Sequence, residues 1–161
     1  MLLHLVDSQS KVLRSSTQPV PEVTNITKEF AYNMLDTMER YKGVGLAANQ
    51  VGSALRVAVI KAAGIRNKPL VLINPEITSC SAKKYESIEG CLSLPGESHR
   101  VMRPEWITIK YLDQHGKEKT LKAKKALARI VMHELDHLCG ICIDSKEFDV
   151  PPLPKLPKMK E

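Results

Sequence analysis

The chain has 161 residues, of which 43% are hydrophobic and 26% charged, and its net charge is +6 at pH 7. These values are typical of one soluble globular domain with a single core. No apolar run reaches membrane-spanning length, and residues 1–6 are too short for a signal peptide and lack a basic start. We therefore expect a cytoplasmic protein with no membrane partner.

Residues 24–41 show the first helical pattern. Apolar side chains recur there at intervals of three and four residues, as on one face of a helix. Thr24 or Asn25 can cap the start of this helix, and Gly43 follows its end. The apolar positions are Ile26, Phe30, Met34, Met38 and Tyr41.

Strands are predicted in the middle of the chain. Apolar runs at 55–60 and 70–73 are short and bounded by Gly, Pro and Asn, which is typical of strands. Residues 106–112 alternate between apolar and polar side chains. The turn at 113–116 joins them to residues 117–122, which we expect to pair back as a hairpin.

Residues 123–138 form the second predicted helix. Its pattern would direct Leu127, Ile130, Val131 and Leu138 towards a core. Two helices with segregated antiparallel strands indicate an α+β fold in a single domain. We expect the antiparallel strands to pack around this second helix.

The last part of the chain has a different composition. Residues 150–161 are rich in Pro and Lys and show almost no apolar periodicity. Such a segment is expected to form an extended tail rather than part of a packed core. Residues 1–149 are then left as the domain that would carry any activity.

The pentad His-Glu-Leu-Asp-His at residues 133–137 is the most informative motif of the chain. On a helix, His133 and His137 project from the same face, so both imidazoles can bind one metal ion. Glu134 lies beside them as a candidate general base. The alternative interpretation is two ordinary histidines on a surface helix, so a metal site needs a third ligand.

The third ligand is not fixed by these residues alone. A motif with a histidine six residues after His137 is excluded, because position 143 is Ile. Several prolines follow and leave no room for another helix, so Glu147 is a poor candidate. Cys91 and His99 remain upstream, although a free cysteine most often behaves as a small buried hydrophobic residue.

Two further features carry weaker implications. Cys139 and Cys142 have the spacing of a redox pair or of half a zinc knuckle, but without a second pair we expect them to pack after the helix. The basic residues within 117–129 and in the segment after Lys155 are interpreted as solvated faces. No nucleic-acid motif is present, so we expect no DNA partner and at most a weak attraction to an RNA-rich particle.

Three separated segments together resemble the peptide deformylase family. Each matches one of the family's three signature blocks, in the same order, and the resemblance extends from about Asp7 to about Gly140. It selects Cys91, rather than His99 or Glu147, as the third metal ligand. The segments are Gly43-Val44-Gly45-Leu46-Ala47-Ala48-Asn49-Gln50, Glu89-Gly90-Cys91-Leu92-Ser93 and His133-Glu134-Leu135-Asp136-His137.

The resemblance implies hydrolysis of the N-formyl group from N-formylmethionine at the N-terminus of newly made polypeptides, with release of formate. Cys91, His133 and His137 would hold one divalent metal ion and leave one coordination position for water. Resemblance to the family favours Fe²⁺ as the native ion, with Zn²⁺ or Ni²⁺ recovered on isolation.

The resemblance also assigns roles to five other residues. Glu134 would act as the general base, while the Gln50 side-chain amide and the Leu92 backbone N–H would stabilise negative charge on the formyl oxygen. Val44 and Gly45 would pair with the substrate backbone as with an added strand. The alternative functions are a metallopeptidase with the same metal ligands and a metal-stabilised binding module without turnover.

The chain departs from the family's pattern in two places. Many members carry a C-terminal helix where this sequence has its Pro- and Lys-rich tail, so transient ribosome association through that segment is in doubt. Met132 stands where the family commonly has Gln before the first histidine. Nearby, Asp136 could orient a metal ligand or pair with Arg103.

Overall fold

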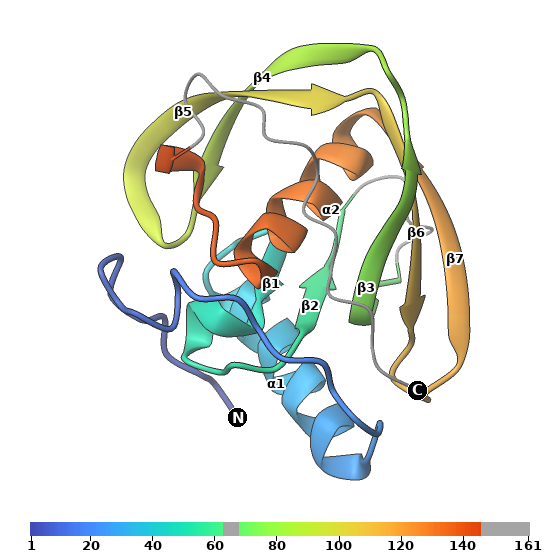
Figure 1. Cartoon of the computed structure of the whole chain (residues 1–161). Coiled ribbons are helices and arrows are strands. Elements are labelled where there is room, and N and C mark those ends of the chain that lie inside the picture. The colour runs from blue at the N-terminus through green and yellow to red at the C-terminus, as the bar shows by residue number, and fades with distance from the viewer. Residues whose placement is uncertain (63–67, 146–161) are drawn as a thin grey trace.

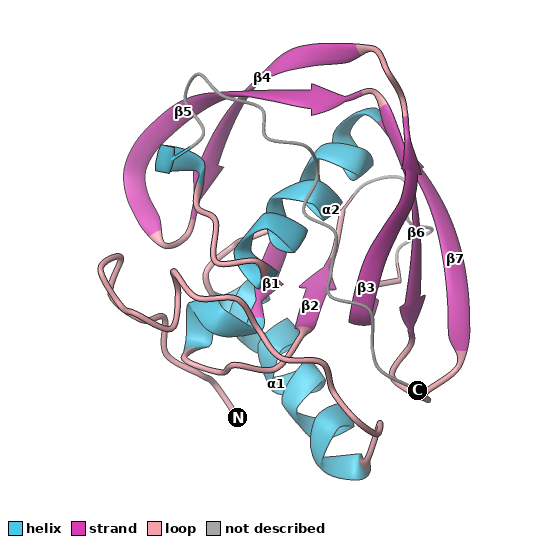
Figure 2. Ribbon diagram, in the orientation of Figure 1, coloured by secondary structure: helices cyan, strands magenta, loops and turns pink. Residues whose placement is uncertain are grey.

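A computed structural model of the chain describes residues 1–62 and 68–145 (Figure 1). The expected tail, residues 150–161, and the alternative ligand Glu147 lie outside these residues. Helices and strands occupy separate parts of the described chain (Figure 2). None of the helices in this part is long and apolar enough to cross a membrane.

Five antiparallel strands form the main sheet, in the order β1-β2-β3-β6-β7. The predicted hairpin of β6 and β7 is confirmed. β3 extends beyond the predicted residue 73, because its second half pairs with β6 across two register shifts. The strands are β1 (Gly45–Ala47), β2 (Val57–Ile60), β3 (Leu70–Cys80), β6 (Trp106–Leu112) and β7 (Glu118–Lys124).

A second sheet was not predicted from the sequence. It consists of β4 (Lys84–Cys91) and β5 (Leu94–Pro104), which pair as an antiparallel ribbon with an irregularity between Glu89 and Cys91. The ribbon curves over α2 (Lys125–Leu138), which lies at the centre of the fold (Figure 1). Two short 3₁₀ helices, η1 (Ala48–Val51) and η2 (Ile143–Ser145), complete the described elements.

Helices cover both faces of β2 and the adjoining part of β3. Because both faces are buried, apolar residues occupy successive positions in these strands instead of alternate ones. Successive residues of a strand face opposite sides, so alternate side chains enter two different core clusters. The cluster with α2 contains Ala58, Ile60 and Leu72. The cluster with α1 (Asn25–Arg40) contains Val57, Val59, Val71 and Ile73.

The first predicted helix is confirmed as α1. Thr24 caps it, because the Thr24 hydroxyl accepts a hydrogen bond from the Thr27 N–H at 3.4 Å. The prediction that Ile26 faces the core is wrong, since this side chain is 81% exposed. Thr27 belongs to the buried stripe of α1. Ile26 precedes it by one position, and one position along a helix rotates the side chain by about 100°, which turns Ile26 away from the core. Tyr41 follows the helix and is also exposed.

The second predicted helix is confirmed as α2. It begins two residues later than predicted, because Ala123 and Lys124 still pair with β6. The main sheet and the β4–β5 ribbon both pack on it, so it buries polar side chains as well as apolar ones. The polar residues are Glu134, Asp136 and His137. The expected α+β fold, with antiparallel strands around a central helix, is therefore confirmed.

Gly140 is predicted to be essential where the chain leaves α2. Its φ is +75°, and an added Cβ would lie 2.7 Å from a backbone carbon of Ser15 and 2.8 Å from that of Arg14. Gly96 has a similar φ of +77° but no atom within 4 Å of an added Cβ, so Gly96→Ala is a matched control.

In urea unfolding, Gly96→Ala should lower the free energy of unfolding by roughly 1–2 kcal/mol through backbone strain alone. Gly140→Ala should lower it by about 1–3 kcal/mol more, because the N-terminal loop must move aside. Equal losses in the two variants would show that the loop does not approach Gly140 as described.

Candidate metal centre

Cys91, His133 and His137 come together where the β4–β5 ribbon meets α2. Cys91 ends β4, and the two histidines lie one turn apart on α2. Their ligand atoms all lie within 4.8 Å of one another, and the Cys91 sulfur is 3.2 Å from His137 Nε2. Among residues 1–62 and 68–145, no other group of three or more such side chains has this geometry.

The donor atoms fit a divalent transition metal. One sulfur and two imidazole nitrogens are ligands that such ions accept, and tetrahedral ligands at normal bond lengths lie roughly 3.3–3.8 Å apart. His99, the other upstream candidate, lies outside this group, and its Nε2 is 2.9 Å from Glu97 Oε2. The geometry therefore agrees with the choice of Cys91.

Glu89 fixes the orientation of the first histidine. Its Oε1 lies 2.9 Å from His133 Nδ1, and an ionised carboxylate can only accept, so Nδ1 carries the proton. The lone pair is then on Nε2, the other ring nitrogen. Burial alone would lower the pKa of His133, but the Cys91 sulfur and the Glu89 carboxylate raise it to about 10. Without a metal ion these neighbours favour a second proton on Nε2, and a bound cation would supply the same positive charge in place of that proton.

Arg103 holds Glu89 in place. Its Nε and Nη2 donate to the two Glu89 oxygens at 2.9 and 2.8 Å, and its Nη1 donates to Asp136 Oδ2 at 2.6 Å. The expected pair of Asp136 with Arg103 is therefore confirmed. Burial would raise the pKa of Glu89, but hydrogen bonds from Arg103 and His133 lower it to about 2. Glu89 is thus an anion beside the histidine.

The surroundings of His137 keep its imidazole neutral and hold its backbone in place. Burial and the charge of His133 lower the pKa of His137 well below its ordinary value, which keeps the imidazole neutral, as a metal ligand must be. The Asn49 side chain donates to the backbone carbonyl of His137 and, at 3.0 Å, to that of Leu13. Asn49 was not singled out as a positioning residue from the sequence.

Cys142 packs against the second ring nitrogen of His137. Its sulfur lies 3.9 Å from His137 Nδ1, and burial raises the pKa of its thiol to about 11. The four cysteines, all within the described ranges, form no disulfide. The expected packing role is therefore confirmed for Cys142.

Glu134 faces the same cavity as His133. The side chain is buried, burial raises its pKa to about 7, and its Oε2 has no hydrogen-bond partner among the described residues. Any side chain on Gly45 would collide with this carboxylate, since an added Cβ would lie 2.8 Å from Glu134 Cδ. Gly45 thus lets β1 approach a carboxylate that is free to accept a proton.

The Gln50 amide is aimed at the end of β4. Its Oε1 accepts from the Ala47 N–H at 2.8 Å, which leaves Nε2 pointing towards the Ser93 hydroxyl at 3.0 Å and the Cys91 sulfur at 3.7 Å. Leu92 follows Cys91, and its side chain lies over Gly43, where an added Cβ would be 2.7 Å from Leu92 Cδ1.

A cavity of about 360 Å³ brings most of the predicted residues together. His137 is the exception, since it lies behind the cavity wall in contact with Cys91. Met132 faces away from it into the core. Lys42 and Glu97 line the cavity but were not expected from the sequence. The predicted residues in the lining are Val44, Gly45, Gln50, Cys91, Leu92, His133 and Glu134.

The chain matches a family model described as polypeptide deformylase over residues 2–147. It is 43% identical over 143 residues to a peptide deformylase of Rickettsia typhi, which covers 84% of this chain and 82% of that protein. It is also 43% identical over 132 residues to a peptide deformylase of Dictyoglomus thermophilum, covering 82% and 84% of the two chains.

Solved structures of such enzymes have the same fold. The crystal structure of peptide deformylase from Ehrlichia chaffeensis matches with a TM-score of 0.87 and 33% identity over 91% of this chain and 88% of that one. A probable peptide deformylase from Synechococcus phage S-SSM7 matches with a TM-score of 0.83 and 33% identity, over 89% and 99% of the two chains. Sequence and structure together show that this chain belongs to the polypeptide deformylase family.

Proposed function

We propose that Cys91, His133 and His137 hold one divalent metal ion, and that Glu134 is the general base of the reaction. As a peptide deformylase, the protein removes the N-formyl group from nascent polypeptides. The observation that carries the proposal is the convergence of three ligand atoms within 4.8 Å beside a buried carboxylate oxygen that has no described partner. Residues 1–149 would form the catalytic domain, and residues 150–161 its tail.

The chemistry divides between the ion and the side chains. A divalent ion in such a site supplies the Lewis acidity that makes water a nucleophile at neutral pH. Glu134 Oε2 would take a proton from the attacking water and deliver it to the departing amine nitrogen. The C–N bond then breaks, and the products are formate and a free N-terminal methionine. The raised pKa of Glu134 suits a group that must both accept and release a proton.

Two donors would stabilise the negative charge that forms on the formyl oxygen. Gln50 Nε2 is oriented for this by its own Oε1, which the Ala47 N–H holds, and by Ser93. The Leu92 backbone N–H would be the second donor. Donors that are fixed before the reaction stabilise a developing charge without reorganisation.

The edge of the main sheet would bind the peptide backbone. β1 is an edge strand, and the Val44 carbonyl already accepts from the Lys61 N–H at 2.9 Å. Neighbouring residues of an antiparallel strand direct their backbone groups to opposite edges, so those of Gly45 are directed away from β2. An extended substrate could therefore add to this edge as a further strand. The half-exposed Val44 side chain would contact it.

The identity of the ion and the cellular setting belong to the same proposal. Cys/His₂ sites accept several ions, and we propose Fe²⁺ as native, with Zn²⁺ or Ni²⁺ after isolation. N-formylmethionyl nascent peptides are the partners, and the enzyme would work in the cytoplasm. Transient ribosome association would rest on the basic residues of 117–129.

Replacement of the proposed base should abolish most of the activity without loss of metal. Glu134→Gln should reduce formate release from formyl-Met-Ala-Ser by about 10²–10⁴-fold, because the amide cannot accept the proton. Glu118→Gln makes the same substitution at an exposed position of β7 and should stay near the wild-type rate. Wild-type activity in Glu134→Gln at equal metal content would rule out this role.

Glu89→Gln should weaken metal binding. The neutral amide accepts a weaker hydrogen bond from His133 Nδ1 than the carboxylate does and holds the ring less firmly, so the dissociation constant for Zn²⁺ should rise about 10–100-fold. Competition with a chromogenic chelator measures it. Glu86→Gln, on an exposed position of the same strand, should bind metal as the wild type does. The proposed role of Glu89 is excluded if the two variants bind equally well.

Metal exchange should separate the candidate ions. Removal of metal with a chelator should stop formate release, and the Fe²⁺ form assayed under argon should be more active than the Zn²⁺ form. Metal content measured on the same samples provides the control. Equal activity per bound ion in the two forms would contradict Fe²⁺ as the preferred ion.

A further inference from the structure

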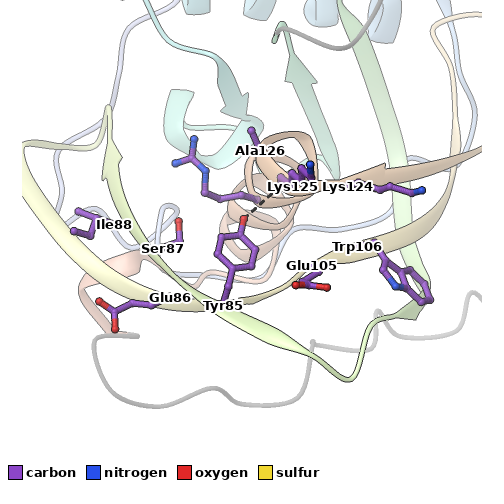
Figure 3. Close-up of a pocket in the computed structure, with 10 residues that line it drawn as sticks. Tyr85, Glu86, Ser87, Ile88, Glu105, Trp106, Lys124, Lys125 and Ala126 are labelled. Carbon is purple, nitrogen blue, oxygen red and sulfur yellow. Dashed lines mark hydrogen bonds between the residues drawn. The ribbon is translucent and has the colours of Figure 1, made fainter.

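The two ends of α2 have different surroundings. At its start, a cavity of about 680 Å³ lies between the helix and β4, and Tyr85 in its lining donates a hydrogen bond to the Lys125 carbonyl at 3.3 Å (Figure 3). At its end the protein is closed, since His137 and Cys142 are each 1% exposed and Leu138 is fully buried. A polar group at this end therefore depends on a partner inside the protein.

His137 has such a polar group at the Nδ1 side of its ring. The Cys91 sulfur lies 3.2 Å from Nε2, so Nε2 is the nitrogen directed to the group of three ligand atoms. When Nε2 binds a metal ion, the proton of the neutral imidazole is on Nδ1, which becomes a buried donor. Within residues 1–62 and 68–145, the hydrogen-bond partner of Nδ1 is the Cys142 sulfur at 3.9 Å, and no other is formed.

Cys142 is held firmly in this place. Its carbonyl accepts from the Ser145 N–H at 3.1 Å and from the Ser145 hydroxyl at 2.6 Å. Rotation of the sulfur away from the imidazole would displace closely packed neighbours, so the sulfur and the ring stay in contact. The buried neighbours in this core cluster are Leu13, Leu94, Val101 and Ile143.

The two histidines are thus supported by acceptors of unequal strength. His133 Nδ1 donates to the ionised Glu89 carboxylate at 2.9 Å, and a hydrogen bond to a charged acceptor is roughly twice as strong as a neutral one. The Cys142 sulfur is a weak acceptor, and its contact is longer. A weaker acceptor adds less to the basicity of the opposite ring nitrogen. The support of His137 is therefore the more easily lost of the two.

We propose that Cys142 is a positioning residue of the metal centre, whose sulfur accepts the hydrogen bond from His137 Nδ1–H and keeps Nε2 directed at the ion. The inference rests on the proposed function, because it requires the ion. It gives one of the two cysteines after α2 a role beyond packing. Loss of this acceptor weakens metal binding, because a buried N–H without a partner is costly.

Zinc binding measures the contribution of the sulfur. Cys142→Val removes the acceptor and leaves no space for a water, so the dissociation constant for Zn²⁺, from competition with a chromogenic chelator, should rise about tenfold. Cys142→Thr has the shape of valine with a hydroxyl acceptor and should bind Zn²⁺ more tightly than Cys142→Val. Cys80→Val, at the exposed end of β3, is the matched control and should bind as the wild type does. Equal dissociation constants for Cys142→Val and the wild type would overturn the proposal.

Nuclear magnetic resonance separates a hydrogen bond from packing. Zn²⁺ has a filled d shell and is diamagnetic, so the imidazole N–H protons of its histidine ligands can be observed in isotope-labelled protein. Cys142→Val should shift the His137 Nδ1–H resonance and leave that of His133 in place, whereas Glu89→Gln should do the reverse. A role in packing alone would change stability but neither resonance, and that result would refute the inference. Failure of the wild type to bind Zn²⁺ would instead contradict the proposed metal centre.

Discussion

The proposed metal centre depends on one buried guanidinium. Cys91 lies on the β4–β5 ribbon and the two histidines lie on α2, so only tertiary contacts can bring the sulfur to the imidazoles. Arg103, whose side chain is 1% exposed, binds Glu89 on β4 and Asp136 on α2 at the same time. Replacement of either carboxylate would break one of the two buried ion pairs by which Arg103 joins β4 to α2, which is destabilising. The ribbon is thus held to the helix at the point where the site forms.

Features set by local periodicity could be predicted from the sequence. Both helices and the β6–β7 hairpin follow from apolar spacing, and the spacing of His133 and His137 places both rings on one face. The third metal ligand could not be predicted in this way. Residue chemistry alone left both Cys91 and His99 as candidates, and only the resemblance to a family selected Cys91. The structure agrees with that choice through the geometry of the three ligand atoms.

The features that could not be predicted depend on contacts between distant residues. In β4 and β5, Gly90, Pro95 and Gly96 interrupt the alternation of apolar and polar side chains. Neither strand therefore has a clear sequence pattern. The importance of Glu89 depends on Arg103, fourteen residues away, which decides that this carboxylate is buried and ionised. Ile26 has an apolar side chain, but the width of the buried stripe on α1 leaves it exposed.

The end of α2 is closed by the beginning of the chain. The Thr17 hydroxyl donates to the Leu138 carbonyl at 2.8 Å, Arg14 pairs with Asp144 at 2.8 Å, and Asn49 holds the His137 carbonyl. These contacts join residues up to 130 positions apart, and such distant pairings form late in folding because long loops must close first. The loop that contains Arg14 and Thr17 therefore cannot pack in its final place until α2 has been synthesised and has left the ribosome.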